Sequence, residues 1–284
     1  MLASHTACPV GDINGDGYLE IIAPGAPNIR AFSHDGSMLW EAVNANQSHV
    51  PAVIANLDGS GPKIIVSEWY RDYVLNGQGN MLPGWPQSVP GLMMGSNFVV
   101  GNFKGGEKLE FLHASQNTSS IFAWNYDGTS VSGFSVNKGN NNSSRCALGD
   151  LNNDNMPEII CGLGWGAPNV RAWDNNGVEL PDSPFVTSGS VEGAPIITDL
   201  DGDGLVDIIA GDTDGKIYVW TLPVPYNPSA TPWPMFQHDA RHTGNYDADV
   251  VPPNIHYSLP DPNNATAGEP FALSFTAEDN VAVN

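Results

Sequence analysis

The sequence has 284 residues, of which 41% are hydrophobic and only 14% are charged. Ten basic residues against 31 acidic ones leave a formal net charge of −21. This balance excludes nucleic acid and anionic membrane surfaces as expected partners, because both are recognised through Lys and Arg. No apolar stretch reaches the roughly 18 residues of a membrane-spanning helix, so we expect no membrane insertion. The 31 Gly and 23 Pro residues predict many short strands joined by tight turns.

The sequence contains an internal repeat of five units. Their acidic or amide-led segments start at residues 12, 56, 102, 150 and 199, which are 44 to 49 residues apart. This period suits a unit of four short strands with their turns. In chain order the segments are Asp12-INGDGYLEII, Asn56-LDGSGPKII, Asn102-FKGGEKLEFL, Asp150-LNNDNMPEII and Asp199-LDGDGLVDII.

Every unit predicts the same succession of strands. A short apolar run precedes each loop, and we expect the first strands at 8–11, 52–55, 98–101, 146–149 and 195–198. A second run follows the loop, at 20–23, 63–66, 110–113, 158–161 and 207–210. The third strand ends in an aromatic residue before an Asp-Gly or Asn-Gly turn, and the fourth is weak and often holds Pro, as in MLPGWP, so it should be an exposed edge.

Repeated four-stranded units bury their faces by stacking radially, so the fold class is all-β, a β-propeller with five visible blades. The aromatic residue near the end of the third strand is expected to pack between blades. The residues concerned are Phe32, Trp124, Trp173 and Trp220.

Three of the five loops carry oxygen-bearing side chains at loop positions 1, 3, 5 and 9. Gly or Asn at position 6 allows a sharp reversal, after which the carbonyl at position 7 can join the shell. Many hard oxygen ligands in a flexible ring suit Ca²⁺ better than Mg²⁺, and the lack of His and Cys disfavours zinc and copper. We therefore predict about three calcium ions. The predicted ligands are Asp12, Asn14, Asp16, Tyr18 and Glu20; Asp150, Asn152, Asp154, Met156 and Glu158; and Asp199, Asp201, Asp203, Leu205 and Asp207.

The other two loops have lost this pattern. The loop at Asn56 is one residue short, and Lys63 stands where the closing acid is expected. In the loop at Asn102, Lys104 replaces the oxygen at position 3, and its ammonium is expected to pair with Glu110 in place of a cation. Both loops are predicted to be metal-free.

These loops also carry a family resemblance. The pattern D-x-[DN]-x-D-[GN]-x-x-[DE] followed by two Ile resembles the FG-GAP/VCBS repeats of integrin α-chain-like propellers, over residues 7 to 246. The resemblance implies that the calcium loops join the first two strands of a blade and are structural. It also implies seven or eight blades, so either this ring closes with five or further blades precede it.

The residues after the last repeat depart from it. The stretch WPMFQHDARHTG holds His238, Asp239, Arg241 and His242 and looks like a segment of secreted bacterial propeller proteins. His238 and His242 could bind a metal, and His238 with Asp239 could act in acid–base chemistry. However, neighbours on a strand point to opposite faces, which favours a structural role. We expect this segment to form the outer strand of the last blade, to pack Trp233 and Phe236, and to pair Arg241 with an acid.

The expected domains are a propeller at 1–246, a Pro-rich linker at 247–254, and the truncated start of an Ig-like or fibronectin-like module at 255–284. Both ends look cut, so we expect a fragment of a longer secreted or cell-surface protein. Cys146 and Cys161 flank one loop and could face each other, but buried free thiols are the preferred interpretation for the three cysteines.

The predicted function is a calcium-stabilised extracellular binding, adhesion or scaffold module for a protein or a glycan. Aromatic residues that could stack on sugars are Trp40, Trp69, Tyr70, Trp85 and Trp165, although most are expected to be packing residues. One alternative is a spacer in a large surface protein. Another is a calcium-dependent polysaccharide lyase or hydrolase, for which the candidate residues are His34, His49, His113 and Arg71, with no motif that joins them.

Overall fold

The computed structural model describes residues 7–25, 28–43, 50–90, 96–139, 144–164, 169–248, 254–258 and 274–278. The chain divides into two compact units, Met1–Asp247 and Ala248–Asn284, and each is described by itself. Within the described residues, no helix is long and apolar enough to cross a membrane. The described secondary structure is almost entirely β, with one 3₁₀ turn at Pro228–Ala230.

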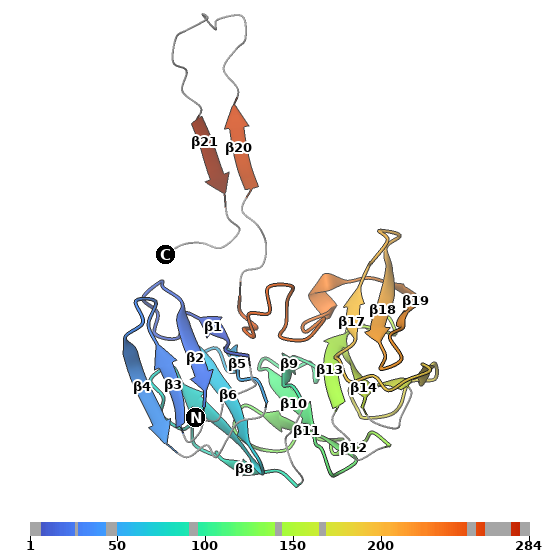
Figure 1. Ribbon diagram of the computed structural model, residues 1–284, viewed down its shortest axis with the longest axis horizontal. Helices are drawn as coiled ribbons and strands as arrows, with labels where there is room; N and C mark the ends of the chain where they lie inside the picture. The colour runs from blue at the N-terminus through green and yellow to red at the C-terminus, as the bar shows by residue number, and fades with distance from the viewer. Residues whose placement is uncertain are drawn as a thin grey trace, which may run out of the picture. The chain divides into compact units, whose positions relative to one another are not determined.

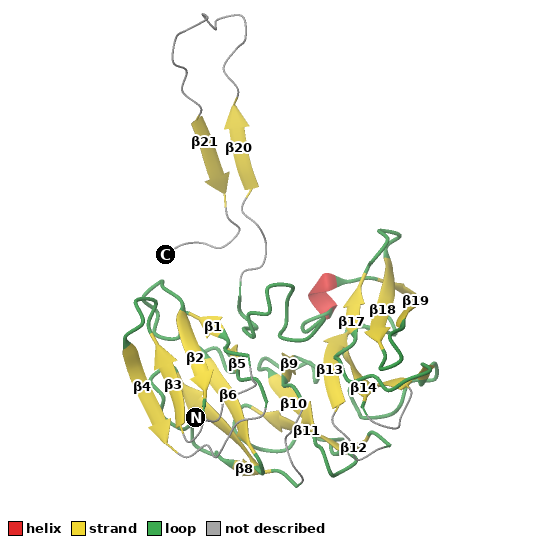
Figure 2. Ribbon diagram, viewed as in Figure 1, coloured by secondary structure: helices red, strands yellow, loops and turns green. Residues whose placement is uncertain are grey.

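The first unit holds five antiparallel sheets, which we call blades 1 to 5 in chain order (Figures 1 and 2). Blade 1 contains β1 (Val10–Gly11), β2 (Glu20–Pro24), β3 (Asn28–Phe32) and β4 (Met38–Val43). Blade 2 contains β5 (Val53–Ala55), β6 (Lys63–Glu68), β7 (Arg71–Asn76) and β8 (Gln87–Ser88). Blade 3 contains β9 (Val99–Gly101), β10 (Glu110–Ala114), β11 (Ser120–Asn125) and β12 (Val136–Asn137). Blade 4 contains β13 (Ser144–Gly149), β14 (Glu158–Leu163), β15 (Asn169–Trp173) and β16 (Phe185–Val186). Blade 5 contains β17 (Ile196–Thr198), β18 (Leu205–Gly211) and β19 (Ile217–Pro225).

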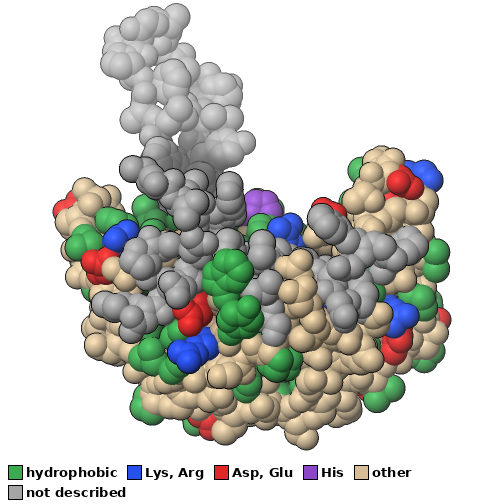
Figure 3. Space-filling model, turned by 60° about the horizontal axis from the view of Figure 1, so that its bottom comes forward, with side chains coloured by type: hydrophobic (Ala, Val, Ile, Leu, Met, Phe, Trp, Pro, Cys, Tyr) green, Lys and Arg blue, Asp and Glu red, His purple; other side chains and the backbone are tan. Residues whose placement is uncertain are grey.

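Strands follow one another within each blade, as the repeat predicts, so the all-β propeller-type fold is confirmed. Neighbouring strands pair in register, for example Ile159 of β14 with Trp173 of β15. The first strands of the blades lie on the inner side of the arc that the sheets form in Figure 1. On the face in Figure 3, charged side chains lie scattered among uncharged ones, in keeping with the low charged fraction.

The core lies between the blades, because blades 2, 3 and 4 each have a neighbouring blade on both faces. The second strands β6, β10 and β14 are buried along most of their length. The predicted aromatic packing is confirmed at Trp124, which is buried and whose Nε1 donates to Asp72 Oδ2 of blade 2 over 3.0 Å. Trp173 is likewise buried, and burying a ring of this size against a neighbouring sheet stabilises the fold by a few kcal/mol, about 3 at most.

The segment after β19 takes a path that differs from the expected one. Residues 228–247, which we call the strap, run along the inner strands and do not form the outer strand of blade 5 (Figure 1). The backbone N–H groups of the inner strands donate to the strap, as in Leu148 to Trp233 O (2.8 Å), Ile54 to Gly244 O (2.8 Å), Val10 to Thr243 O (3.1 Å) and Ile197 to Pro234 O (2.9 Å). The physical reason is that an inner strand is a sheet edge whose backbone groups need partners.

The path of the strap brings the side chains of His238 and Asp239 together. Gln237 and His238 both have positive φ, so the chain turns there and adjacent side chains can meet. His238 Nδ1 lies 3.3 Å from Asp239 Oδ2, and the expectation that they point to opposite faces is wrong. Asp239 also accepts bonds from Thr243 and from the Arg241 backbone, while Trp233 is fully buried against the His238 ring. These contacts give the pair a structural role.

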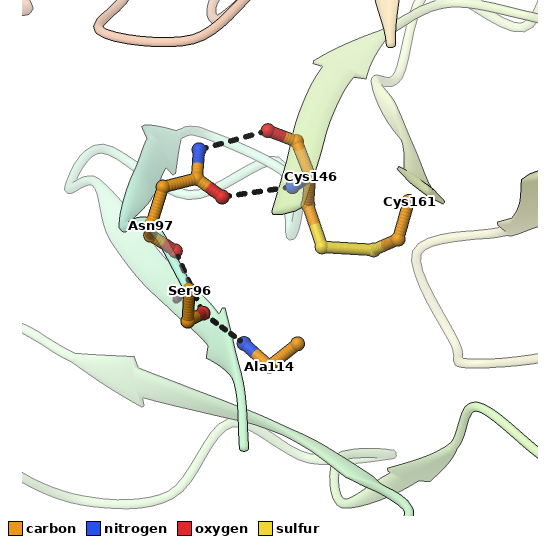
Figure 4. Close-up of a disulfide and its surroundings, with 5 residues drawn as sticks. All are labelled: Ser96, Asn97, Ala114, Cys146 and Cys161. Carbon is orange, nitrogen blue, oxygen red and sulfur yellow. Dashed lines mark hydrogen bonds between the residues drawn. A yellow bond between two sulfur atoms is a disulfide. The ribbon is translucent and has the colours of Figure 1, made fainter. Parts of the chain in front are cut away.

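The preference for free thiols is wrong at two of the three cysteines. Cys146 of β13 and Cys161 of β14 form a disulfide, with Cα atoms 4.0 Å apart (Figure 4). The Asn97 side chain donates to Cys146 O (3.0 Å) and accepts from Cys146 N–H (2.8 Å), so both backbone groups point away from β14. The two cysteines thus form a pair without mutual backbone hydrogen bonds, the arrangement in which side chains come closest. Cys8 is a free, exposed thiol.

In the second unit, β20 (Asn254–Ser258) pairs antiparallel with β21 (Ser274–Glu278). The register runs from Asn254 opposite Glu278 to Ser258 opposite Ser274. The remaining residues of the expected Ig-like stretch, 259–273 and 279–284, lie outside the described residues.

Candidate metal centres

The three acidic loops join the first and second strands of blades 1, 4 and 5, and they share one backbone conformation. In each, the Asp at position 1 accepts hydrogen bonds from the N–H groups of positions 4 and 6. The bonds run from Gly15 (2.7 Å) and Gly17 (2.9 Å) to Asp12, from Asn153 (2.7 Å) and Asn155 (2.9 Å) to Asp150, and from Gly202 (2.8 Å) and Gly204 (3.0 Å) to Asp199.

Positions 4 and 6 explain why these loops tolerate so few residue types. All six residues there have φ between 63° and 85°, a region that only Gly and Asn enter readily. The loop then folds over position 5, whose carboxylate Oδ1 accepts the N–H of position 7 over 2.8 Å in all three loops. Sequence reasoning used the Gly or Asn at position 6 and missed the equal demand at position 4.

The closing acids of blades 1 and 4 are buried with one oxygen unpaired. Glu20 Oε2 accepts the Ile13 N–H (3.0 Å), and Glu158 Oε2 accepts the Leu151 N–H (2.8 Å). In both residues Oε1 is buried and has no hydrogen-bond partner. A buried, unpaired carboxylate oxygen is unfavourable unless a cation or a proton meets it.

The pKa values of the closing acids in the blade 4 and blade 1 loops also favour a bound cation. Burial raises the pKa of Glu158 to about 8, and the nearby carboxylates of Asp154 and Asp150 add to the shift. Burial also raises the pKa of Glu20, with Asp16 and Asp12 contributing. At both acids the neighbouring carboxylates raise the pKa, at Glu20 against a smaller opposing effect of His34, and the donor set fits a bound cation.

Each loop brings three carboxylates together, with oxygen atoms within 4.8 Å of one another. Such groups can hold a metal ion. They comprise Asp12, Asp16 and Glu20; Asp150, Asp154 and Glu158; and Asp199, Asp201 and Asp207. Asp203 lies outside its group, and the ligand roles of all the predicted residues, those of Asn14, Asn152 and the carbonyls of Tyr18, Met156 and Leu205 included, stay predictions.

The blade 5 loop differs from the other two at its closing acid. Asp207 Oδ2 accepts the Leu200 N–H (2.9 Å), and Asp207 Oδ1 accepts the hydroxyl of Thr221 (2.6 Å). Both oxygens thus have protein partners, so the loop has less need of a cation. We infer that this is the weakest of the three candidate centres.

The blade 2 loop holds a cation of its own. The nearly buried ammonium of Lys63 donates to Asp58 Oδ1 (2.9 Å), Ser60 Oγ (3.0 Å) and the Gly61 carbonyl (2.5 Å). Asp58 and Ser60 are positions 3 and 5 of the loop, which are metal-ligand positions in the acidic loops. Lys63 thus brings a positive charge to the centre of the loop, and the pKa of Asp58 falls to about 2, because the bonds from Lys63 and Ser60 outweigh burial.

We expect Lys63→Met to lower the free energy of unfolding by about 2 kcal/mol, because Asp58 loses its only ion-pair partner among the described residues while keeping some access to water. Urea unfolding with and without calcium measures the loss. Lys104→Met is the matched control, with a smaller expected effect. A Lys63→Met variant as stable as the unmodified chain would contradict this interpretation.

The predicted pairing of Lys104 with Glu110 in blade 3 is wrong. The Lys104 Nζ leaves its own loop and donates to the carbonyl of Asn175 and to Asn176 Oδ1 (3.4 Å) in the turn between β15 and β16. The buried Glu110 instead accepts the Phe103 N–H (3.1 Å). A long side chain reached a carbonyl of the neighbouring blade, which local sequence does not reveal.

The residues considered for sugar stacking divide into two kinds. Trp40 Nε1 donates to Gly77 O (2.9 Å) and Trp85 Nε1 to Tyr126 O (3.1 Å), so both pack against the following blade. Tyr70 is exposed, Trp69 is half-buried, and Trp165 lies outside the described residues.

The described residues considered for catalysis lie in separate blades. His34 is exposed and stacks on Tyr18 of the blade 1 loop, with ring centroids 4.2 Å apart. Arg71 is exposed at the start of β7. His113 is fully buried with its Nε2 2.7 Å from Asp72 Oδ2, which closes it to a substrate. His49 lies outside the described residues.

No protein-family model and no curated protein sequence matches the chain. Among solved structures, the biofilm matrix protein Bap1 of V. cholerae matches with a TM-score of 0.51 and 22% identity, over 76% of this chain and 39% of that chain. The chain therefore spans well under half of the Bap1 chain. BBS1N, solved in complex with ARL6DN, matches with a TM-score of 0.54 and 12% identity, over 79% of this chain and 70% of that chain. These likenesses show a propeller-type fold, and the narrower FG-GAP/VCBS assignment stays a prediction.

Proposed function

We propose that the chain is a calcium-stabilised extracellular scaffold or binding module whose partner is a protein or a glycan. The observation that carries the proposal is the buried, unpaired Oε1 of Glu20 and of Glu158, each set among the carboxylates of one loop. Oxygen donors at loop positions 1, 3, 5 and 9, without His or Cys, favour Ca²⁺ as the ion. The ammonium of Lys63 in the blade 2 loop supports the idea that this loop shape needs a positive charge.

Two further observations support an extracellular setting. The Cys146–Cys161 disulfide is typical of proteins from oxidising compartments. A solved structure of similar fold is described as a biofilm matrix protein. A scaffold or binding role agrees with a fold whose three acidic groups lie in three different blades.

Thermal unfolding with and without calcium tests the stabilising role. Each site at a calcium concentration of about 100 times its Kd adds about 2.7 kcal/mol, which raises the Tm of a domain of this size by roughly 5 °C or more. We therefore expect excess EGTA to lower the Tm by at least that much while the fold survives, and Mg²⁺ not to restore it. An unchanged melting curve in EGTA would remove the structural role of the loops.

The binding role is tested separately with glycan and protein arrays in calcium and in EGTA. We expect a hit that is lost in EGTA if the module recognises its partner in the calcium-bound state. Arrays that stay blank in calcium would favour a spacer.

A further inference from the structure

The repeat allows a comparison of the same position in all five blades. The residue directly after the closing position of the loop faces the preceding blade: Phe111 of blade 3 stacks on Trp85 of blade 2, with ring centroids 5.5 Å apart. This residue is 0% exposed in blades 2 to 5, where it is Ile64, Phe111, Ile159 or Ile208. In blade 1 it is Ile21, which is 43% exposed. Leu19, two residues earlier, is exposed as well. Blade 1 thus presents an uncovered apolar surface, which we call the leading face.

The opposite side of blade 5 shows the complementary exposure. Position 2 of the loop faces the following blade: the carbonyl of Leu57 in blade 2 accepts the Leu109 N–H of blade 3 over 2.9 Å. In blades 1 to 4 this residue is at most 4% exposed, as Ile13, Leu57, Phe103 or Leu151. In blade 5 it is Leu200, which is 55% exposed.

Two other residues extend this surface of blade 5. Val219 of β19 is 47% exposed, whereas its equivalents Ala31, Val74, Ala123 and Ala172 are buried. Ile209 pairs with Val219 on the same face and is partly exposed, whereas its equivalent is buried in every earlier blade. We call Leu200, Ile209 and Val219 the trailing face.

The leading and trailing faces are the two halves of one joint, which the chain already makes between its own consecutive blades. We propose that the trailing face of one copy packs against the leading face of a second copy, in a head-to-tail contact. The joint between blades 2 and 3 predicts its details: Ile21 would insert as Phe111 does, and the Leu19 N–H would donate to Leu200 O as Leu109 does to Leu57. Because every copy carries both faces, the contact is heterologous and builds a closed ring or an open chain.

The experiment uses two variants that each block one face. Ile21→Arg places a charge on the leading face, and Val219→Arg places one on the trailing face. Both side chains are exposed in the single copy, so both variants should fold, which far-UV circular dichroism and the Tm verify. Mass is measured by light scattering after size exclusion, over a dilution series in calcium.

The head-to-tail contact gives a specific pattern. The unmodified chain assembles, each variant alone is a monomer, and an equal mixture of the two variants forms a 1:1 dimer that does not extend, since one intact leading face meets one intact trailing face. Leu19→Arg and Leu200→Arg form a second pair with the same expected pattern. Val178→Arg, an exposed valine in the turn between β15 and β16, is the matched control and should assemble like the unmodified chain.

Other outcomes overturn the proposal. A monomeric unmodified chain at every concentration would show that the faces do not join copies. Self-association of Val219→Arg alone would indicate a symmetric contact between leading faces, and a mixture of two monomers without a 1:1 dimer would show that the faces are not complementary.

Discussion

Replacing Asp150 with alanine is expected to lower the free energy of unfolding by about 3 kcal/mol even before calcium is considered. Its buried carboxylate accepts backbone N–H groups from Asn152 (3.2 Å), Asn153 (2.7 Å), Asp154 (3.3 Å) and Asn155 (2.9 Å). Hydrogen bonds to a charged acceptor contribute about 1.5 to 3 kcal/mol each, and the loop recovers part of the loss by turning its N–H groups to water.

The measurement is urea unfolding in EGTA and again in calcium. Asp12→Ala is the matched control, because Asp12 has the same loop position in blade 1 but lies in a more exposed loop, and its loss should be nearer 1 kcal/mol. In calcium the Asp150→Ala loss should grow, since a candidate ligand goes with the side chain. A loss for Asp150→Ala no larger than that for Asp12→Ala would contradict the role of the buried carboxylate.

Removing the disulfide has an effect of similar size. The free energy of unfolding of the Cys146→Ala, Cys161→Ala double variant should be about 3 kcal/mol lower, because the bond closes a loop with a sequence separation of 15 residues. Both sulfurs are buried, so a small packing loss adds to the entropic one.

Chemical unfolding of the oxidised chain and of the double variant measures the difference. Cys8→Ala is the control, because Cys8 is free and exposed, and it should change stability by less than about 0.5 kcal/mol. The disulfide joins the two strands that carry the Asp150 loop, so the losses from removing the disulfide and Asp150 should not add. A double variant of unchanged stability would mean that the hairpin is held by its other contacts alone.

Much of the architecture could be predicted because the repeat is local. Each loop and the apolar runs beside it lie within about 15 residues, so strand order and loop placement followed from spacing and turn chemistry. The demand for positive φ at Gly15, Asn153 and Gly202 could also have been deduced, since all three are Gly or Asn at loop position 4.

The wrong predictions depend on contacts between distant residues. Asn97 turns the backbone of Cys146 away from β14 from 49 residues upstream, and this relation is invisible in the spacing of the cysteines. The strap forms hydrogen bonds with inner strands as distant in sequence as the one that holds Val10. The backbone groups at the edges of these strands have no partner within their own sheets, and the strap supplies one. Lys104 donates to the Asn175 carbonyl of blade 4 and not to Glu110 in its own blade, and this contact also joins residues that are far apart in sequence.

The most direct test of the proposed calcium sites is a count of bound calcium. Isothermal titration of the chelated chain should show about three ions per chain, with the site of the Asp199 loop the weakest. Asp12→Ala, Asp150→Ala and Asp199→Ala should each remove one ion, and Lys63→Met should leave the count unchanged. A chain that binds no calcium, or a count that none of the three aspartate variants lowers, would contradict the assignment of these loops as calcium sites.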